Sequence, residues 1–249
     1  LLGHNNVGKT HFTFYLMLLY SLKHNIRWLV FSSENEPYSL IKKLVEFIEG
    51  KPINKIEQKD YDKSLKFVFD HFKFVDCNKN YTYKQLLALA KSIKDAWDYH
   101  GLLIDPILGS NGYEYSYEQL TDIRIFCKEH NITTWICCHA VTEALRRKHT
   151  PNHEFGGQPM PPSIGDAEGG AVNANRADDF LIIHRYIYSP DSWMYTRLYV
   201  AKVKMQELGY KPTSYEAPLM FKSIINNVGF ELGGKNFVTY RSKKQAKLL

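Results

Sequence analysis

Eight residues near the start of the chain, Gly3 to Thr10, have the pattern G-x-x-x-x-G-K-T, and an apolar, helix-like segment follows directly. In this pattern the backbone N–H groups of the loop and of the helix start point at phosphate oxygens. The lysine reaches the β and γ phosphates, and the threonine hydroxyl is a magnesium ligand. We therefore expect ATP and Mg2+ to bind at Gly3, Asn6, Val7, Gly8, Lys9, Thr10 and His11.

A second candidate is Asp105, which closes the apolar run Gly101 to Asp105 (GLLID). A carboxylate at the end of a buried strand is where P-loop ATPases hold magnesium. Pro106 follows at once, so a strand-terminal aspartate that makes a turn is the alternative. Together with the phosphate loop, Asp105 is interpreted as the second magnesium ligand beside Thr10.

Two glutamates, Glu34 and Glu36, follow the apolar run RWLVFSS. A carboxylate in this place could orient and deprotonate the water that attacks the γ-phosphate. Because the two glutamates lie two residues apart, geometry must choose between them. We favour Glu34 as the catalytic base, since an acid at the start of a helix, as at Glu36, is also favoured by the helix dipole.

A polar residue also ends the apolar run TTWICC, namely His139. From a strand end, a histidine can contact the γ-phosphate and report its presence to the loop that follows. The alternative is a buried histidine whose hydrogen bonds are satisfied within the protein.

Apolar runs of strand length alternate with amphipathic helical segments, which predicts an α/β fold with a mostly parallel sheet flanked by helices. Helices are expected at 10–22, 37–48, 81–97 and 117–130, and strands at 27–33, 73–76, 101–105 and 133–138. The segment 142–177 is rich in Gly, Pro, Asn and charge, and long irregular segments are usually functional or mobile. Late strands or hairpins are expected at 179–184, 194–204, 217–222 and 228–232.

The 249 residues suit one large domain, which we place at 1–240 with a basic tail at 241–249. No apolar run is long enough for a membrane span and no signal segment is visible, so we expect a cytoplasmic protein without a membrane partner. The net charge of +6 gives weak support for a polyanionic partner. Because the phosphate loop begins at the third residue, we expect the chain to be a fragment with its upstream part missing.

The order GHNNVGKT, FSSEN, LLIDP and CCHA resembles the DnaB-like and Twinkle-like ring helicases, which include many phage and bacterial primase-helicases. The resemblance covers almost the whole chain and implies a RecA-like P-loop NTPase core with late antiparallel strands. It implies that Glu34 is the catalytic base and that His139 is the γ-phosphate sensor. It also implies that Lys9 acts in catalysis.

Further on, VAKVK resembles the family's K-x-R element, whose arginine finger enters the ATP site of the neighbouring subunit. The finger position here is Lys204, preceded by Lys202. A lysine presents a point charge rather than a planar fork, so it can stabilise a γ-phosphate but not bidentately. Two lysines on the exposed face of a strand are the alternative.

In this family the loops that face the central channel contact DNA, and the resemblance points to two such loops. One is the basic triplet Arg146, Arg147 and Lys148, and the other is the glycine-rich stretch around Gly169, Gly170 and Asn173. Phosphate contacts need cations and backbone amides, which both loops offer.

The resemblance implies a hexameric replicative helicase that hydrolyses ATP between subunits to move along single-stranded DNA, with a primase domain or protein as a further partner. Two alternatives stay open at this point. One is a RecA-like recombination or repair ATPase, and the other is a nucleotide-dependent assembly switch without catalysis.

Overall fold

A computed structural model of the chain describes residues 1–106, 113–208 and 211–238. Its contacts divide the chain into two compact units, each made of three segments. The first unit comprises Leu1–Lys9, Gly109–Asp122 and Cys137–Lys222. The second unit comprises Thr10–Leu108, Ile123–Ile136 and Ser223–Leu249.

The second unit contains a parallel sheet of four strands in the order β3-β2-β4-β5. Its strands are β2 (Trp28–Ser32), β3 (Phe72–Phe74), β4 (Gly101–Asp105) and β5 (Thr133–Ile136), with β10 (Phe230–Leu232) later in the chain. Its helices are α1 (Lys9–His24), α2 (Pro37–Glu49), α3 (Gln58–His71), α4 (Tyr83–Ala96) and the end of α5 (Tyr113–His130). Short 3-10 turns lie at Ile53–Lys55 and Ile225–Asn227.

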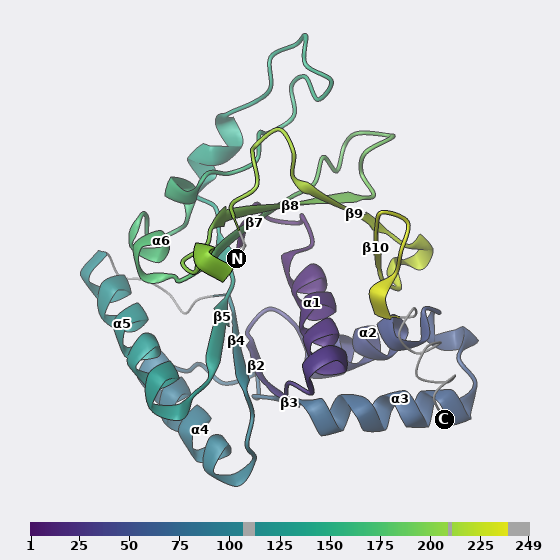
Figure 1. Cartoon of the computed structure of the whole chain (residues 1–249), viewed down its shortest axis with the longest axis vertical. Coiled ribbons are helices and arrows are strands. Elements are labelled where there is room, and N and C mark those ends of the chain that lie inside the picture. Colours follow the sequence, from purple (N-terminus) through teal and green to yellow (C-terminus); the bar gives the residue numbers. More distant parts are fainter. Residues whose placement is uncertain (107–112, 209–210, 239–249) are drawn as a thin grey trace. The chain divides into compact units, whose positions relative to one another are not determined.

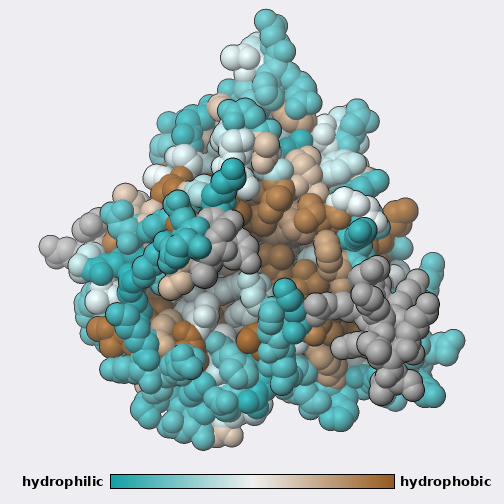
Figure 2. Space-filling model, in the orientation of Figure 1, coloured by the Kyte–Doolittle hydropathy of each residue, from teal (hydrophilic) through white to brown (hydrophobic). Residues whose placement is uncertain are grey.

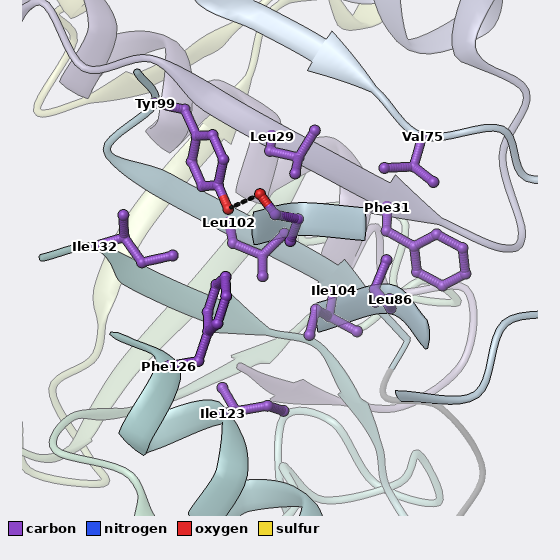
Figure 3. Packing of buried hydrophobic residues seen from close by; sticks show 11 residues of the cluster. Leu29, Phe31, Val75, Leu86, Tyr99, Leu102, Ile104, Ile123, Phe126 and Ile132 are labelled. Carbon is purple, nitrogen blue, oxygen red and sulfur yellow. Dashed lines mark hydrogen bonds between the residues drawn. The ribbon is translucent and has the colours of Figure 1, made fainter. Parts of the chain in front are cut away.

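Alternate side chains of this sheet pack against different helices, as the period of two in a strand requires. Leu29 and Leu102 face α4 and α5, and Phe126 and Ile132 complete that side (Figure 3). The buried Tyr99 hydroxyl donates a hydrogen bond of 3.0 Å to the Ala90 carbonyl of α4, so its polar atom is satisfied inside the core. Helix α1 covers the other side of the sheet (Figure 1).

One close approach explains a glycine in this sheet. Trp28 and Gly101 are register partners in β2 and β4. A Cβ atom on Gly101 would lie 2.2 Å from Cε3 of the Trp28 ring, so only glycine leaves room for the indole. Trp135 of β5 then packs edge-on against the same indole at 5.1 Å.

The first unit contains the remaining strands, in the order β9-β8-β7-β1-β6. These are β1 (Leu2–Gly3), β6 (Cys138–His139), β7 (Phe180–His184), β8 (Tyr195–Lys202) and β9 (Leu219–Ser223). The short strand β1 is parallel to both β6 and β7, whereas β7, β8 and β9 are antiparallel to one another. The helical pieces are α6 (Val172–Arg176) and 3-10 turns at Thr142–Arg146, Ile164–Asp166 and Gln206–Leu208.

The predicted α/β fold, with parallel strands first and antiparallel strands late, is confirmed. Three details differ from the expectation. The strand expected at 133–138 is interrupted at Cys137, because β5 pairs with β4 and β6 pairs with β1. Helix α3 was not expected, and the irregular segment 142–177 includes α6.

The expected basic tail lies outside the described residues. None of the helices in the part of the chain that the structure describes has the length and apolar character needed to cross a bilayer.

Candidate nucleotide-binding site

The phosphate loop connects β1 to α1 and adopts a backbone that depends on its small residues. Asn6 and Gly8 have positive φ angles of 62° and 85°. Asparagine and glycine are the residues that tolerate this left-handed region best. At Gly3 a Cβ atom would lie 2.8 Å from the backbone oxygen of Ile183 and 3.1 Å from Val7 Cγ2, so a side chain there would collide with the sheet and the loop.

Lys9 lies inside the curve of this loop and is almost fully buried, with 7% of its surface exposed. Its Nζ donates hydrogen bonds of 3.1 Å to the carbonyl oxygens of Gly3 and His4. A third contact of 3.1 Å joins Nζ to Nδ1 of His139, at the end of β6. A buried ammonium held at the centre of a loop is a cation ready to neutralise a bound anion.

The Lys9 contact also assigns the tautomer of His139. An ammonium group has donors only, so Nδ1 must accept the hydrogen bond and the proton of the neutral ring is on Nε2. The backbone of His139 leads to the glycine-rich loop, because its carbonyl accepts a hydrogen bond of 2.9 Å from the Glu168 N–H. His139 therefore contacts the Lys9 side chain with its ring and the start of the glycine-rich loop with its backbone.

In the second unit, the first turn of α1 carries the Thr10 hydroxyl to Asp105. Thr10 Oγ1 donates a hydrogen bond of 2.6 Å to Asp105 Oδ2. Asp105 is 2% exposed and ends β4, where its register partner in β2 is Ser32. A hydroxyl and a buried carboxylate in contact form a pair of oxygen ligands of the kind that Mg2+ takes in nucleotide sites.

Glu34 and Glu36 leave the end of β2, the strand next to Asp105. The carboxyl ends of parallel strands meet at one edge of a sheet, so Glu34 lies at the same edge as the Thr10–Asp105 pair. Glu36 has a local role as the N-cap residue of α2, and its carboxylate lies 3.6 Å from the Cys77 sulfur. This arrangement favours Glu34 over Glu36 as the group that faces a nucleotide.

One cation beside the loop was not anticipated from the sequence. Nε and Nη2 of Arg185 donate hydrogen bonds of 3.1 and 2.6 Å to the Trp193 carbonyl, across the hairpin between β7 and β8. These bonds aim Nη1 at the phosphate loop, 3.4 Å from the place that a Cβ on Gly8 would take. Burial lowers the pKa of Arg185 from 12.5, but an arginine stays charged at neutral pH. Its position after the strand FLIIH was the signal that could have found it.

The two lysines of the K-x-K element have different surroundings. Lys202 Nζ donates hydrogen bonds of 2.7 and 2.8 Å to the carbonyl oxygens of Ala174 and Ala177, at the end of α6. Lys204 is half exposed and forms an ion pair of 2.6 Å with Asp178. Lys202 thus fastens α6 to β8, whereas Lys204 presents its charge at the surface.

The residues expected to contact DNA divide in the same way. Arg146 and Lys148 are exposed, and Arg147 pairs with Asp166. Asn173 is buried instead, and its Nδ2 donates hydrogen bonds to the carbonyl oxygens of Glu168 and Gly170. Its side chain therefore shapes the glycine-rich turn from within.

The remaining phosphate-site candidates are held by packing. Val7 is buried, and the His11 ring packs edge-on against Phe47 at 4.8 Å and Phe230 at 5.5 Å. These contacts leave the backbone N–H groups of the loop and of the first turn as the phosphate donors that the sequence pattern expects. The described residues hold no cluster of three or more His, Cys, Asp or Glu, which suits Mg2+ bound by few protein ligands and by phosphate oxygens.

Among solved structures, this fold is found in the ATPase domain of a DnaB-like helicase, with a TM-score of 0.67 and 12% identity over 92% of this chain and 82% of that one. It is also found in a DnaB-like replicative helicase whose interactions with primase were described, with a TM-score of 0.66 and 12% identity. The match covers 92% of this chain and 55% of that second helicase. No protein-family model and no curated protein matches the sequence.

The fold of this chain is therefore that of the DnaB-like helicase ATPase domains, and the predicted RecA-like core is confirmed. The chain spans about half the length of the second structure, so it corresponds to one part of that protein.

Proposed function

We propose that the chain is an ATP-hydrolysing motor domain of a DNA helicase. The observation that carries the proposal is the contact of 2.6 Å between the Thr10 hydroxyl and the buried Asp105 carboxylate. In the sequence this threonine directly follows a phosphate loop whose lysine is buried within it. Loop, lysine, hydroxyl and strand-end carboxylate are the parts from which P-loop ATPases build their nucleotide site.

In this proposal ATP binds with its phosphates on the loop N–H groups of residues 3–11. Lys9 exchanges its contacts with Gly3 and His4 for the β and γ oxygens, and Arg185 adds a second cation beside Gly8. Thr10 and Asp105 hold Mg2+, which supplies charge neutralisation at the phosphates when bound. Lys202 keeps its structural contacts with α6.

Glu34 then orients and deprotonates the attacking water from the edge of the sheet beside Asp105. His139, which contacts Lys9, senses the γ-phosphate and passes its presence to the Gly169–Gly170 turn through its carbonyl. Lys204 acts in the site of a neighbouring subunit, after its ion pair with Asp178 opens. Such a finger residue stabilises the charge that develops on the transferred phosphoryl group.

The partners follow from the same proposal. We infer a homo-hexameric ring in the cytoplasm that moves on single-stranded DNA, with Arg146, Arg147 and Lys148 contacting phosphates and Asn173 supporting the second loop. A primase domain or protein is a further partner in the intact protein. The similarity to a DnaB-like helicase studied with primase supports this inference.

The catalytic role of Glu34 has a matched control in Glu36, which has the same side chain two residues away. We expect Glu34→Gln to lower kcat for ATP by about 10²- to 10⁴-fold, the usual contribution of a general base. Nucleotide affinity, measured by fluorescence titration, should persist. Glu36→Gln should keep most of the turnover. If neither substitution changed turnover, the chain would be a nucleotide-dependent switch rather than a motor.

The cross-subunit role of Lys204 is tested separately. A finger residue is worth about 10³-fold or more in kcat, so Lys204→Ala should nearly abolish turnover of the assembled protein. Lys211→Ala, an exposed lysine later in the same unit, serves as the control. Wild-type turnover in Lys204→Ala would leave Lys204 as a surface lysine paired with Asp178.

A further inference from the structure

The second residue of the phosphate loop, His4, makes a contact that the proposed function does not use. Its ring is buried, with 3% of the residue exposed. Nε2 lies 3.1 Å from the carbonyl oxygen of Met160, a residue 156 positions away in the sequence. A carbonyl oxygen only accepts, so Nε2 carries the proton and donates this hydrogen bond. The phosphate loop is therefore tied directly to the segment that ends at Met160.

That segment, residues 147–160, forms a hairpin that we call the basic hairpin. The Met160 N–H donates to the Arg147 carbonyl at 2.8 Å, and the His149 N–H donates to the Gln158 carbonyl at 3.0 Å. Lys148 and Pro159 form an antiparallel bridge between the same two arms. A displacement of Met160 is thus transmitted through hydrogen bonds to Arg147 and Lys148 in the opposite arm.

The basic hairpin is found at the top of Figure 1, and its outer surface is hydrophilic in Figure 2. Arg147 and Lys148 are exposed at its base, directly after the exposed Arg146. Because this surface carries three adjacent cations, a polyanion such as a nucleic-acid backbone is the ligand whose charge it fits.

A row of rings runs parallel to the His4 contact. The His4 ring packs edge-on against His184 of β7 at 5.8 Å, and His184 packs against Tyr186 at 4.5 Å. Tyr186 in turn stacks on Phe155 of the hairpin at 3.6 Å and shares a hydrogen bond of 2.7 Å with His149. Packed rings transmit displacement, since close-packed interiors do not deform freely.

The type of residue at this position supports a specific role. Within the described part of the chain, His4 Nδ1 is buried without a hydrogen-bond partner, and a buried polar atom of this kind is unfavourable. An aliphatic side chain could fill the space without that penalty. What histidine adds is the N–H donor to Met160.

We propose that His4 is a positioning residue that couples the nucleotide at the phosphate loop to polyanion binding at the basic hairpin. The inference rests on the proposed function, because it requires ATP at the loop and a polyanion at Arg146, Arg147 and Lys148. It is distinct from the His139 route, which leads to the Gly169–Gly170 turn. By thermodynamic reciprocity, the polyanion changes nucleotide affinity by the same factor as the nucleotide changes polyanion affinity.

The test measures the coupling factor, defined as the ratio of two Kd values for a fluorescent single-stranded oligothymidylate. One Kd is measured without nucleotide, and the other with Mg2+ and a saturating non-hydrolysable ATP analogue. In the wild type we expect a factor of about 5 to 150, the usual range for coupled sites. In His4→Leu, which lacks the donor, the factor should fall to within about twofold of unity. His4→Gln, which keeps an N–H donor, should retain a factor well above one.

Arg146→Ala is the matched control on the hairpin. It should weaken oligothymidylate binding both with and without the analogue, because it removes a phosphate contact, and it should leave the coupling factor unchanged. A wild-type coupling factor in His4→Leu would overturn the inference while leaving the proposed function in place. A wild type that binds the analogue and the oligonucleotide with a factor of one would do the same. A wild type that binds neither ligand would instead overturn the proposed function.

Because a buried substitution can prevent folding, a second measurement uses the wild type alone. Amide hydrogen exchange of His149, Gly157 and Met160 reports the hydrogen bonds that close the hairpin. We expect the analogue with Mg2+ to change these exchange rates several-fold without any DNA. Exchange rates that stay the same in the hairpin while those of the phosphate loop change would contradict the coupling.

Discussion

In the second unit the core around β2 and β4 is built from aliphatic and aromatic side chains, whereas the first unit buries His4, His184 and Arg197 beside its sheet. The Arg197 guanidinium lies over the rings of Phe155 and Tyr186, at 4.7 and 4.5 Å. Burying such groups is unfavourable unless they are paired, so they are poor choices for stability alone. They connect the phosphate loop with the basic hairpin. We infer that the second unit supplies stability and that the interior of the first unit serves the coupling of sites.

The largest expected effect is on the core of the second unit. Leu102 is fully buried in β4, so Leu102→Ala should lower the free energy of unfolding by about 2–5 kcal/mol, from lost burial and the cavity left behind. Urea unfolding followed by circular dichroism measures this loss. Phe69→Ala on α3, where the ring is 54% exposed, should change stability by less than about 0.5 kcal/mol. Equal losses in both variants would contradict the account of this core.

In the first unit, the close approach at Gly3 gives the next largest effect. A Cβ there meets the Ile183 backbone oxygen, which cannot move aside as a flexible side chain could. Gly3→Ala should therefore destabilise by about 1–3 kcal/mol and weaken ATP binding. Gly165→Ala is the control, since the nearest atom to its Cβ would be Ser163 Oγ at 4.0 Å. The pair is compared by thermal unfolding and nucleotide titration, and a tolerated Gly3→Ala would refute the tight packing at the loop.

The pH dependence of stability reports on the buried histidines. Burial first, and then the neighbouring His4 and Arg197, lower the pKa of His184 to about 3. The unfolded chain, with a pKa of about 6.5, takes up the proton first, so this contribution is complete above pH 6.5 and is lost as the pH falls. Between pH 7.5 and 5.5 the loss is about 1.4 kcal/mol. In His184→Phe that part of the slope should disappear, and an unchanged slope would place the pH sensitivity elsewhere.

The smallest effect is expected at the surface of the first unit. Lys204 and Asp178 are about half exposed, and exposed ion pairs contribute about 0–1 kcal/mol. Lys204→Ala should therefore leave the melting temperature nearly unchanged, even though its proposed effect on turnover is large. A substantial loss of stability would show that Lys204 has a structural role.

The sequence predicts the second unit well, because its central strands are continuous buried runs. RWLVFSS and GLLID correspond to β2 and β4 to within two residues at each end. Helix α3 escaped prediction because its only fully buried residues are Ser64 and Val68, which give too weak an apolar stripe. The strand break at Cys137 escaped it too, since pairing with different neighbours leaves no mark on an apolar run.

The site divides along the same line. Lys9, Thr10 and Asp105 were found because a local pattern and a strand end mark them. Arg185 and His4 have no such mark, because their roles come from contacts with Gly8 and Met160 that only the folded chain creates. The unpartnered His4 Nδ1 is likewise a property of the fold and not of the sequence.

The measurement that tests the central claim most directly is steady-state ATP turnover, with and without single-stranded DNA, beside a Lys9→Ala control. The account predicts measurable turnover in the wild type that single-stranded DNA increases several-fold. It predicts none above background in Lys9→Ala, whose loop lacks the buried cation. Wild-type turnover no higher than that of Lys9→Ala, at every protein and DNA concentration, would contradict the proposal that this chain is a DNA-coupled ATPase.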